Sequence, residues 1–346
     1  MKLVSGLVGL LSVTNALADI TAEWASWKSE HGFSFNAVEE PTRFKHWLST
    51  KDFVKNHNEK FNNGEVRFTV SMNKFSAMPN EEFKELYLMK EVEREIVNDQ
   101  VVSEYQCPTK YSSKKGGAPS SYSWRDHRAV TKVKDQGSCG SCWTFGAGAA
   151  IEGAMCKKGN YNCNTWNGVS AQQFVDCASS NRDLSPYDNS GCDGGFQSNA
   201  MRYVWTIPKG VDSWDNYPYT GKEQSCNYRS SNSVGTIKSC GKLGHAGDED
   251  LMVDMVYHEG VTTVAIDASG REFQQYSGGV YHSTSCSSTR LNHAVTMTGY
   301  GGSGSGKYFE VKNSWGTGWG LSGFINFERA GNNMCGVATE GQYAIL

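Results

Sequence analysis

The sequence predicts an α+β fold of two lobes, with helices in the first lobe and antiparallel strands in the second, preceded by a small helical domain. Three observations predict it. Apolar residues recur at three- and four-residue steps between residues 20 and 61. Beyond residue 118 the chain becomes rich in glycine, cysteine and tryptophan and has helical stretches first. Alternating and β-branched stretches follow, so functional groups from both lobes are expected to meet in a cleft.

The first 18 residues read as a secretory signal peptide. Lys2 is the positive end, residues 3–13 form the apolar run, and Ala16-Leu17-Ala18 is the small-residue cleavage site. The apolar run is too short to cross about 30 Å of hydrocarbon, and no other stretch is long enough, so we expect no membrane span. The secretory route is oxidising, and most of the eleven cysteines are therefore expected to form disulfides. An odd number leaves at least one thiol unpaired.

Residues 19 to about 105 differ in composition from the rest of the chain. Residues 19–117 are called the N-terminal segment below, and residues 118–346 the main domain. The apolar spacing in the N-terminal segment predicts helices over about 20–31 and 39–61. Residues 66–72 alternate apolar and polar and predict a short strand. Ser, Lys, Gly and Pro from residue 111 to 121 predict an exposed linker that a protease could reach.

The main domain is expected to begin with helices and to end with strands. The predicted helices cover about 141–157, closing near Gly159, and 171–176. The predicted strands cover 262–267, 293–300, 307–313 and 323–328, with glycine-rich turns between them. The formal net charge of −3 gives no basic excess for phosphate or anionic lipid. We therefore expect no nucleic-acid or membrane-surface partner.

One cysteine stands at the predicted start of a helix, within the string Gln136-Gly137-Ser138-Cys139-Gly140-Ser141-Cys142-Trp143. Exposed N–H groups at a helix N-terminus favour negative charge, so the position is expected to lower the pKa of the Cys142 thiol. His293 follows about 150 residues later in the string NHAV, and Asn313 opens NSWGTGWG. A lone histidine is usually a core or surface residue. The three strings in this order instead indicate a thiol nucleophile with its base.

These strings and spacings resemble the papain family of cysteine peptidases, over nearly the whole chain after the signal. The resemblance implies a papain-like two-lobed fold, with a helical lobe and an antiparallel β-barrel-like lobe, and a cysteine endopeptidase that acts through a thioester acyl-enzyme. It implies that Cys142 is the nucleophile, His293 the general base and acid, and Asn313 the group that orients the imidazole. Gln136 would donate to the oxyanion, and Trp315 would shield the hydrogen bond between Asn313 and His293.

The same resemblance assigns three disulfides, leaving Cys142 as the candidate free thiol. They are Cys139–Cys192, Cys177–Cys226 and Cys286–Cys335. Four cysteines lie outside this pattern: Cys107, Cys156, Cys163 and Cys240. Cys156 and Cys163 are close enough in sequence for a local bridge, whereas Cys240 could pair with Cys107 or stay free.

Substrate selection is also implied by resemblance. Gly194 and Gly195 match a glycine pair whose backbone binds extended substrate, where a Cβ would obstruct approach. Residues that would contact substrate near the scissile bond, mostly around the side chain two positions before it, are Phe196, Ala265, Leu291, Asn292, Ala294 and Trp315. Glu340 would lie at the floor of that pocket, which would accept bulky apolar side chains and also Arg.

The N-terminal segment resembles the family's inhibitory pro-peptide. Its long-helix motif is matched by Glu39, Arg43, Trp47, Val54 and Asn58, with Thr50 where an Asn is usual. Asn73 and Phe75 match the second motif, but Ser71 and Ala77 replace its Gly and Asp, which weakens any acid-triggered release resting on that Asp. The implied product is a latent zymogen, cut in the linker around 105–120, with a mature N-terminus near Ala118.

Other functions stay open from sequence. One is an exopeptidase of the same family, although no paired-histidine occluding loop follows Gly195. Another is a catalytically dead relative serving as a binding or matrix protein. The pair Cys139 and Cys142 has no second pair at metal-binding distance, so no metal and no cofactor are expected. Expected partners are protein or peptide substrates, the chain's own pro-peptide and cystatin-like inhibitors of a monomeric enzyme. With no N-glycan sequon, a lysosome- or vacuole-like compartment and secretion remain alternatives.

Overall fold

The computed structural model describes residues 19–89, 92–93, 95–97, 100–102, 106–113, 115–179, 189–206 and 210–346. The predicted signal peptide lies outside the described residues. No described helix is long and apolar enough to cross a membrane.

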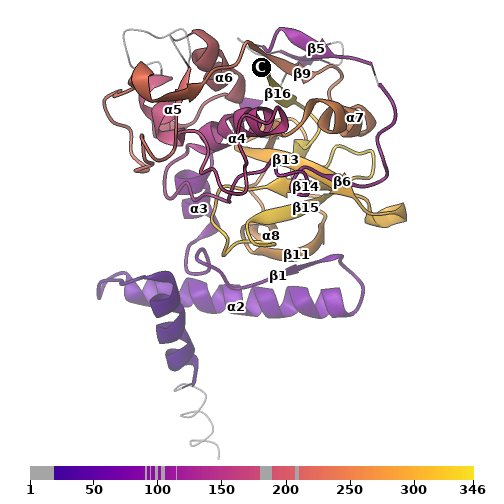
Figure 1. Cartoon of the computed structure of the whole chain (residues 1–346). Coiled ribbons are helices and arrows are strands. Elements are labelled where there is room, and N and C mark those ends of the chain that lie inside the picture. The colour runs from indigo at the N-terminus through magenta and orange to yellow at the C-terminus, as the bar shows by residue number, and fades with distance from the viewer. Residues whose placement is uncertain are drawn as a thin grey trace, which may run out of the picture.

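The N-terminal segment begins with two crossed helices, as predicted. One covers residues 19–31 and the other is α2 (Glu40–Asn62). Trp24 stacks on Trp27 with ring centroids 5.2 Å apart, and Trp47 completes this buried aromatic cluster. Figure 1 shows the two helices on one side of the molecule, with the strand β1 between α2 and the main domain.

The predicted strand after α2 is present as β1 (Phe68–Val70). Asn58 of α2 holds it through two hydrogen bonds, because its Nδ2 donates to the Val70 carbonyl at 2.9 Å and its Oδ1 accepts from the Val70 N–H at 3.1 Å. β1 pairs with β11 (Tyr276–Tyr281) of the main domain. A helix that was not predicted, α3 (Asn80–Tyr87), follows and leads the chain into the cleft.

The helical lobe is built on α4 (Cys142–Lys157), which is buried along most of its length. Small residues let it lie close to the sheet: a Cβ at Gly146 would fall 2.4 Å from Thr263 Oγ1, and one at Gly153 would fall 2.5 Å from Val261 Cβ. The helix ends before Gly159, whose φ of +84° suits glycine. α5 (Ala171–Cys177) and α6 (Gln197–Thr206) pack beside it.

The second lobe is a ten-stranded sheet that contains all four predicted strands. These are β10 (Thr262–Ile266), β13 (His293–Gly301), β14 (Tyr308–Lys312) and β15 (Phe324–Glu328). The order is β1-β11-β15-β14-β13-β10-β16-β9-β5, and β6 pairs with β13. Two pairs, β11 with β15 and β5 with β9, are parallel. The four predicted strands pair with one another antiparallel, as expected. The two parallel pairs involve β11, β5 and β9, which were not predicted.

The other elements are mostly short. They are β2 (Val92–Glu93), β3 (Glu95–Val97), β4 (Gln100–Val102), β5 (Thr109–Tyr111), β6 (Tyr122–Ser123), β7 (Val211–Asp212), β8 (Ser233–Gly235), β9 (Ser239–Leu243), α7 (Glu249–Glu259), α8 (Arg271–Gln274), β12 (Arg290–Leu291) and β16 (Gly341–Ile345). The 3-10 turns are η1 (Gly191–Asp193), η2 (Ser230–Asn232), η3 (Gly304–Gly306) and η4 (Met334–Gly336).

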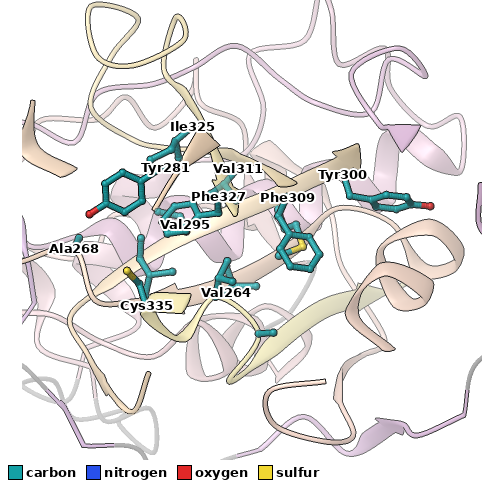
Figure 2. Close-up of a cluster of buried hydrophobic side chains, with 14 of the residues drawn as sticks. Val264, Ala268, Tyr281, Val295, Tyr300, Phe309, Val311, Ile325, Phe327 and Cys335 are labelled. Atoms are coloured by element: carbon teal, nitrogen blue, oxygen red, sulfur yellow. The ribbon is translucent and has the colours of Figure 1, made fainter. Parts of the chain in front are cut away.

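The core of the second lobe consists of β-branched and aromatic side chains on the central strands. Figure 2 shows Val264, Val295, Phe309, Val311 and Phe327 converging from β10, β13, β14 and β15. Burying an aliphatic or aromatic side chain of this kind contributes about 1.5–3 kcal/mol. The core fixes the start of β13, which carries His293.

All eleven cysteines lie among the described residues, and ten of them form disulfides. The pairs are Cys107–Cys240, Cys139–Cys192, Cys156–Cys163, Cys177–Cys226 and Cys286–Cys335. They include the three implied by the resemblance and the local bridge, and Cys240 pairs with Cys107. Cys142 is the free thiol.

The expected exposed linker is only partly correct. Side chains from Ser112 onward are mostly exposed, but Tyr111 is buried and belongs to β5. The reason is a tertiary contact, since β5 pairs with a strand more than a hundred residues away.

Candidate active site

The site lies where the first turn of α4 meets the start of β13. Cys142 is the first residue of α4, and His293 is the first residue of β13. The Ala294 N–H donates to Cys142 Sγ at 3.3 Å. The side chains of Cys142, His293 and Ala294 are all buried. One lobe thus supplies Cys142 and the other supplies His293, and the structure brings together two residues that the sequence could connect only through their spacing.

His293 is oriented by Asn313, the residue that directly follows the neighbouring strand β14. Its Nε2 lies 2.8 Å from Asn313 Oδ1, and because an amide oxygen only accepts, the ring must donate from Nε2. His293 Nδ1 is buried without a hydrogen-bond partner. Trp315 stacks on the imidazole at 4.6 Å between centroids and covers this side of the pair. The neutral ring therefore has its unprotonated nitrogen available as a base.

Burial dominates the electrostatics of both groups. It raises the pKa of the Cys142 thiol to about 12, although backbone N–H groups of Ala294, Trp143 and Cys142 itself act in the opposite direction. It also lowers the pKa of His293 to about 4, against the hydrogen bond with Asn313, which raises it. The expected lowering of the thiol pKa at the helix start is wrong for this state, because desolvation outweighs the helix end.

The side-chain amide of Gln136 is held by three hydrogen bonds. Its Nε2 donates to the Cys139 carbonyl at 2.9 Å and to the Tyr87 carbonyl at 3.1 Å. Its Oε1 accepts from Ser314 Oγ at 2.6 Å, which fixes the direction of the amide. Tyr87 belongs to the N-terminal segment, so a backbone carbonyl of that segment occupies the Gln136 donor.

The N-terminal segment continues through the site in extended conformation. The Met89 N–H donates to the Asn292 carbonyl at 2.8 Å. A Cβ on Gly194 would fall 3.1 Å from Met89 Cβ, and one on Gly140 would fall 3.3 Å from the Leu88 carbonyl oxygen. Residues 87–89 thus cover the cleft from Gln136 to Gly194.

Two phenylalanines of the N-terminal segment dock on Trp315, the ring that stacks on His293. Phe75 and Phe83 are fully buried and meet Trp315 edge to face, with centroids 5.4 and 5.2 Å apart. Asn73 secures the turn before them, because its Nδ2 donates to the Gln274 carbonyl at 2.9 Å. The segment therefore contacts both the Gln136 side of the site and the Trp315 ring that covers His293.

The residues expected to select substrate are only partly brought together. Ala265 lies opposite Ala294 in the pairing of β10 with β13, and Leu291 packs against Gly336. Glu340 lines a separate hollow with Gln106, Cys107, Lys242 and Leu243. Phe196 is half-buried, and its N–H donates to Asn189 Oδ1 at 2.8 Å. Gly195 has no room for a Cβ, which would fall 2.7 Å from Asn189 Oδ1.

Sequence reasoning missed several residues that build the site. Ser314 fixes Gln136 and was visible only as a letter within NSWG. Tyr219 holds the backbone of Gln136, since its hydroxyl donates to the Gln136 carbonyl at 2.7 Å. The same hydroxyl lies 2.6 Å from Ser141 Oγ. No local signal marks Tyr87 as the residue that reaches Gln136. Among the described residues, no group of three or more His, Cys, Asp or Glu side chains could hold a metal ion.

Comparisons with known proteins agree with this arrangement. The family model described as "Papain family cysteine protease" matches residues 118–345, and the "Cathepsin propeptide inhibitor domain (I29)" matches residues 24–83. The chain is 36% identical to "Cathepsin L" of Sarcophaga peregrina and 37% identical to "Digestive cysteine proteinase 1" of Homarus americanus. The first match covers 97% of both chains, and the second 97% of this chain and 98% of the relative.

A solved structure described as digestive procathepsin L 3 of Tenebrio molitor larval midgut superposes with a TM-score of 0.82 at 35% identity. It covers 94% of this chain and 99% of that one. The α+β architecture of this chain, with a helical N-terminal region and a sheet-rich lobe, is the one expected from the sequence. The chain therefore belongs to the papain family of cysteine proteases, as a cathepsin L-like protease made as a proenzyme.

Proposed function

We propose that this protease is an endopeptidase in which Cys142 is the nucleophile and His293 the general base and acid. The single observation that carries the proposal is the contact of α4 with β13. It brings the free thiol of Cys142 to the Ala294 N–H, beside an imidazole already oriented by Asn313. His293 Nδ1 is unpartnered and therefore able to take the thiol proton.

The reaction would proceed in two stages. Cys142 attacks the scissile carbonyl, forming a carbon–sulfur bond, and the imidazolium of His293 passes its proton to the leaving amine. Water then attacks the thioester, with His293 as base, and releases the acid and the thiol. Asn313 is a neutral amide, so it fixes the ring without removing its proton.

The proposed oxyanion donors are Gln136 Nε2 and the Cys142 backbone N–H. Charge develops on the carbonyl oxygen in the tetrahedral intermediate, so donors fixed in advance gain strength as the reaction proceeds. Gln136 already holds a carbonyl oxygen, that of Tyr87, at 3.1 Å. This contact supports the assignment, because an inhibitory backbone there takes the position of a substrate carbonyl.

An active-site titration tests the proposal. The proenzyme is acidified, and the processed protein is titrated with an epoxide that alkylates active thiolates while peptide hydrolysis is followed. We expect one label per chain, on Cys142, and loss of hydrolysis in proportion. Cys142→Ser should abolish both. Absence of label, or label without any hydrolysis beforehand, would favour a catalytically dead relative.

We also propose that residues 19–117 form the inhibitory pro-peptide and residues 118–346 the peptidase domain, with release following a cut around 105–120. The blocked donor of Gln136 and the covered Gly194 support inhibition by occupancy of the cleft.

Cystatin-like inhibitors would bind the cleft after release. We expect the enzyme to be monomeric and to act in a lysosome-like compartment or outside the cell. The five disulfides agree with the oxidising route to either place.

For specificity, we propose that Glu340 lets the pocket accept Arg as well as bulky apolar side chains. Paired peptides with Phe or Arg two residues before the scissile bond test this. Glu340→Ser should lower the Arg-to-Phe ratio of kcat/KM by about tenfold or more, because a charge-assisted contact is lost. Glu340→Gln is the matched control for shape, and it should lower the ratio too. An unchanged ratio in both variants would place Glu340 outside the pocket, as its hollow beside Lys242 would allow.

A further inference from the structure

One strand of the main sheet comes from before residue 118. β5 (Thr109–Tyr111) pairs in parallel with β9, opposite residues 241–243, and is the last strand at that edge of the sheet. Figure 1 shows β5 and β9 together near α7, on the side of the molecule opposite α2. The segment 106–113 is thus part of the main domain by its packing, although it precedes the region that the peptidase family model matches.

A disulfide makes this attachment covalent. Cys107 is bonded to Cys240 of β9, and the two residues are 1% and 0% exposed. The other four disulfides join cysteines that all follow residue 118. This bridge alone connects the main domain to the stretch between the two family matches, which end at 83 and begin at 118.

The chain after Cys107 is held by further contacts with α7. The Tyr111 hydroxyl donates to Asp254 Oδ2 at 2.6 Å, and the N–H groups of Lys115 and Gly116 donate to the same carboxylate at 2.6 and 3.0 Å. Tyr111 is 5% exposed and meets Tyr343 edge to face at 6.4 Å. A charged acceptor with three donors is a strong anchor for a short segment.

The inhibitory part of the N-terminal segment has no such bond. Cys107 is the first cysteine of the sequence, so nothing before it can form a disulfide. Residues 87–89 hold the cleft through hydrogen bonds and packing alone. Once the chain is cut between residue 89 and Cys107, these contacts can dissociate, whereas β5 cannot leave without reduction of Cys107–Cys240.

Exposed side chains follow β5 directly. Ser112, Ser113, Pro119 and Ser120 are all exposed, so a protease can reach the backbone on the C-terminal side of Tyr111. Hydrolysis there adds one water to one peptide bond and yields a new carboxylate and a new amine. It neither reduces nor oxidises the disulfide.

We propose that the active enzyme keeps residues 106–113 as a disulfide-linked strand, so that one cut before Cys107 and another near Ala118 give a two-chain protease instead of residues 118–346 alone. The inference rests on the proposed release by cleavage around 105–120. Thiol exchange needs a thiolate to reach a sulfur, and both sulfurs are buried, so the bridge persists in mild reductant. The retained strand also covers the edge of β9, which would otherwise expose unpaired backbone groups.

Mass spectrometry of the activated protein tests the proposal. The full proenzyme is acid-activated, labelled with the epoxide, and its remaining thiols are alkylated before intact-mass analysis with and without reduction. We expect the unreduced labelled enzyme to carry a peptide containing Cys107, and reduction to release it with one hydrogen added to each sulfur. A single chain that begins before Cys107 would contradict the two-chain form, because it lacks the cut near Ala118. Labelled enzyme without Cys107, in which Cys240 is alkylated, would overturn it.

Failure of the proposed function is distinguishable, because it would show as absence of the epoxide label whatever peptide is attached. A variant pair adds a second measurement. Cys107→Ala with Cys240→Ala should give labelled enzyme that has lost the peptide and melts at a lower temperature. Cys156→Ala with Cys163→Ala removes a bridge within the main domain and should keep the peptide. Retention of the peptide by the first variant would show that the bridge is not what holds it, and if that variant fails to fold, the wild-type masses decide.

Discussion

At the scale of single residues, the amide of Gln136 is fixed before any substrate arrives. Ser314 Oγ donates to its Oε1 at 2.6 Å, so its Nε2 must face the cleft, where it meets the Tyr87 carbonyl. The donor is therefore preorganised, which is the property that makes an oxyanion donor effective. The same bond that inhibits the proenzyme indicates how the active enzyme would hold its intermediate.

Gln136→Ala is expected to lower kcat of the activated enzyme by about 10²–10³, with a much smaller change in KM, because the lost donor acts on the transition state. Steady-state hydrolysis of a peptide substrate measures this. Gln136→Glu keeps the shape and removes the donor, and should be impaired to a similar degree. A change confined to KM in both variants would mean that Gln136 only positions substrate.

A second residue-scale prediction concerns the thiol in the proenzyme. Burial raises the pKa of Cys142 to about 12 and lowers the pKa of His293 to about 4, so between these values both groups are neutral. Iodoacetamide should therefore alkylate the proenzyme slowly at pH 6 and faster as the pH rises to 10. In the activated enzyme water and the helix end favour the thiolate, and the reaction should already be fast at pH 6.

The shape of the two pH profiles separates ionisation from steric shielding. Cys142 is the free thiol of the chain, so the alkylation of unfolded protein gives the total for normalisation. Shielding alone would lower the proenzyme rate by a constant factor at every pH. Parallel profiles would therefore contradict the proposed effect of burial on the pKa.

At the scale of elements, local patterns identified some parts and could not identify others. Strands such as β10 and β13 were predicted because alternating and β-branched stretches favour strands, and both strands are buried along their whole length. α7 was missed although Asp248 caps it, accepting from the Leu251 N–H at 2.8 Å, and Gly260 follows its last residue. β5 could not be predicted, since three residues within a Ser- and Lys-containing stretch become a strand only by pairing with β9.

The residues of the candidate site also include some that the sequence identified and others that it could not. Cys142, His293, Asn313 and Gln136 stand in motifs, and the fold brings them together. The contact of Tyr87 with Gln136 depends on how α3 directs the chain into the cleft, and it leaves no trace in the local sequence. Likewise, the hollow around Glu340 depends on residues far apart in the chain.

The docking of α3 leads to a prediction about latency. Phe83 is fully buried in α3 and meets Trp315 at 5.2 Å. Removing such a ring typically costs about 3–5 kcal/mol, and here much of the loss falls on the contact between the N-terminal segment and the main domain. Phe83→Ala proenzyme should activate spontaneously near neutral pH at a rate about tenfold or more above wild type.

The rate of appearance of peptide hydrolysis in freshly purified proenzyme measures this latency. Val38→Ala is a matched control in the same segment, because Val38 is 87% exposed and its change should leave the rate unaltered. An equal acceleration in both variants would point to general destabilisation of the segment. An unchanged rate for Phe83→Ala would mean that residues 87–89 suffice for inhibition.

At the scale of the whole molecule, two parts that pack extensively must separate on activation, and we expect acid to favour their separation. The Asp usual in the second motif is replaced by Ala77, which is buried and cannot respond to pH. A different group spans the interface at β1. Arg67 pairs with Glu328 of β15, and His282 Nδ1 lies 2.5 Å from the same carboxylate. One carboxylate thus faces two groups that are cations at low pH.

Burial, and then the charge of Arg67, lower the pKa of His282 below its ordinary value of 6.5. The part of this lowering that Arg67 causes exists only while β1 is docked, so docking favours the neutral ring, and this contribution to docking is lost as the pH falls below about 6.5. Departure of β1 removes Arg67 and lets His282 take up its proton. Protons therefore favour release, and His282→Gln should shift the pH at which the proenzyme activates to lower values. Activation rates of the proenzyme between pH 4 and 7 measure the shift. His127→Gln is the control, because the His127 ring stacks on Tyr122, and this variant should activate with the same pH dependence as wild type. A His282→Gln profile that coincides with wild type would assign the acid response to other ion pairs across the interface, such as Lys74 with Asp135.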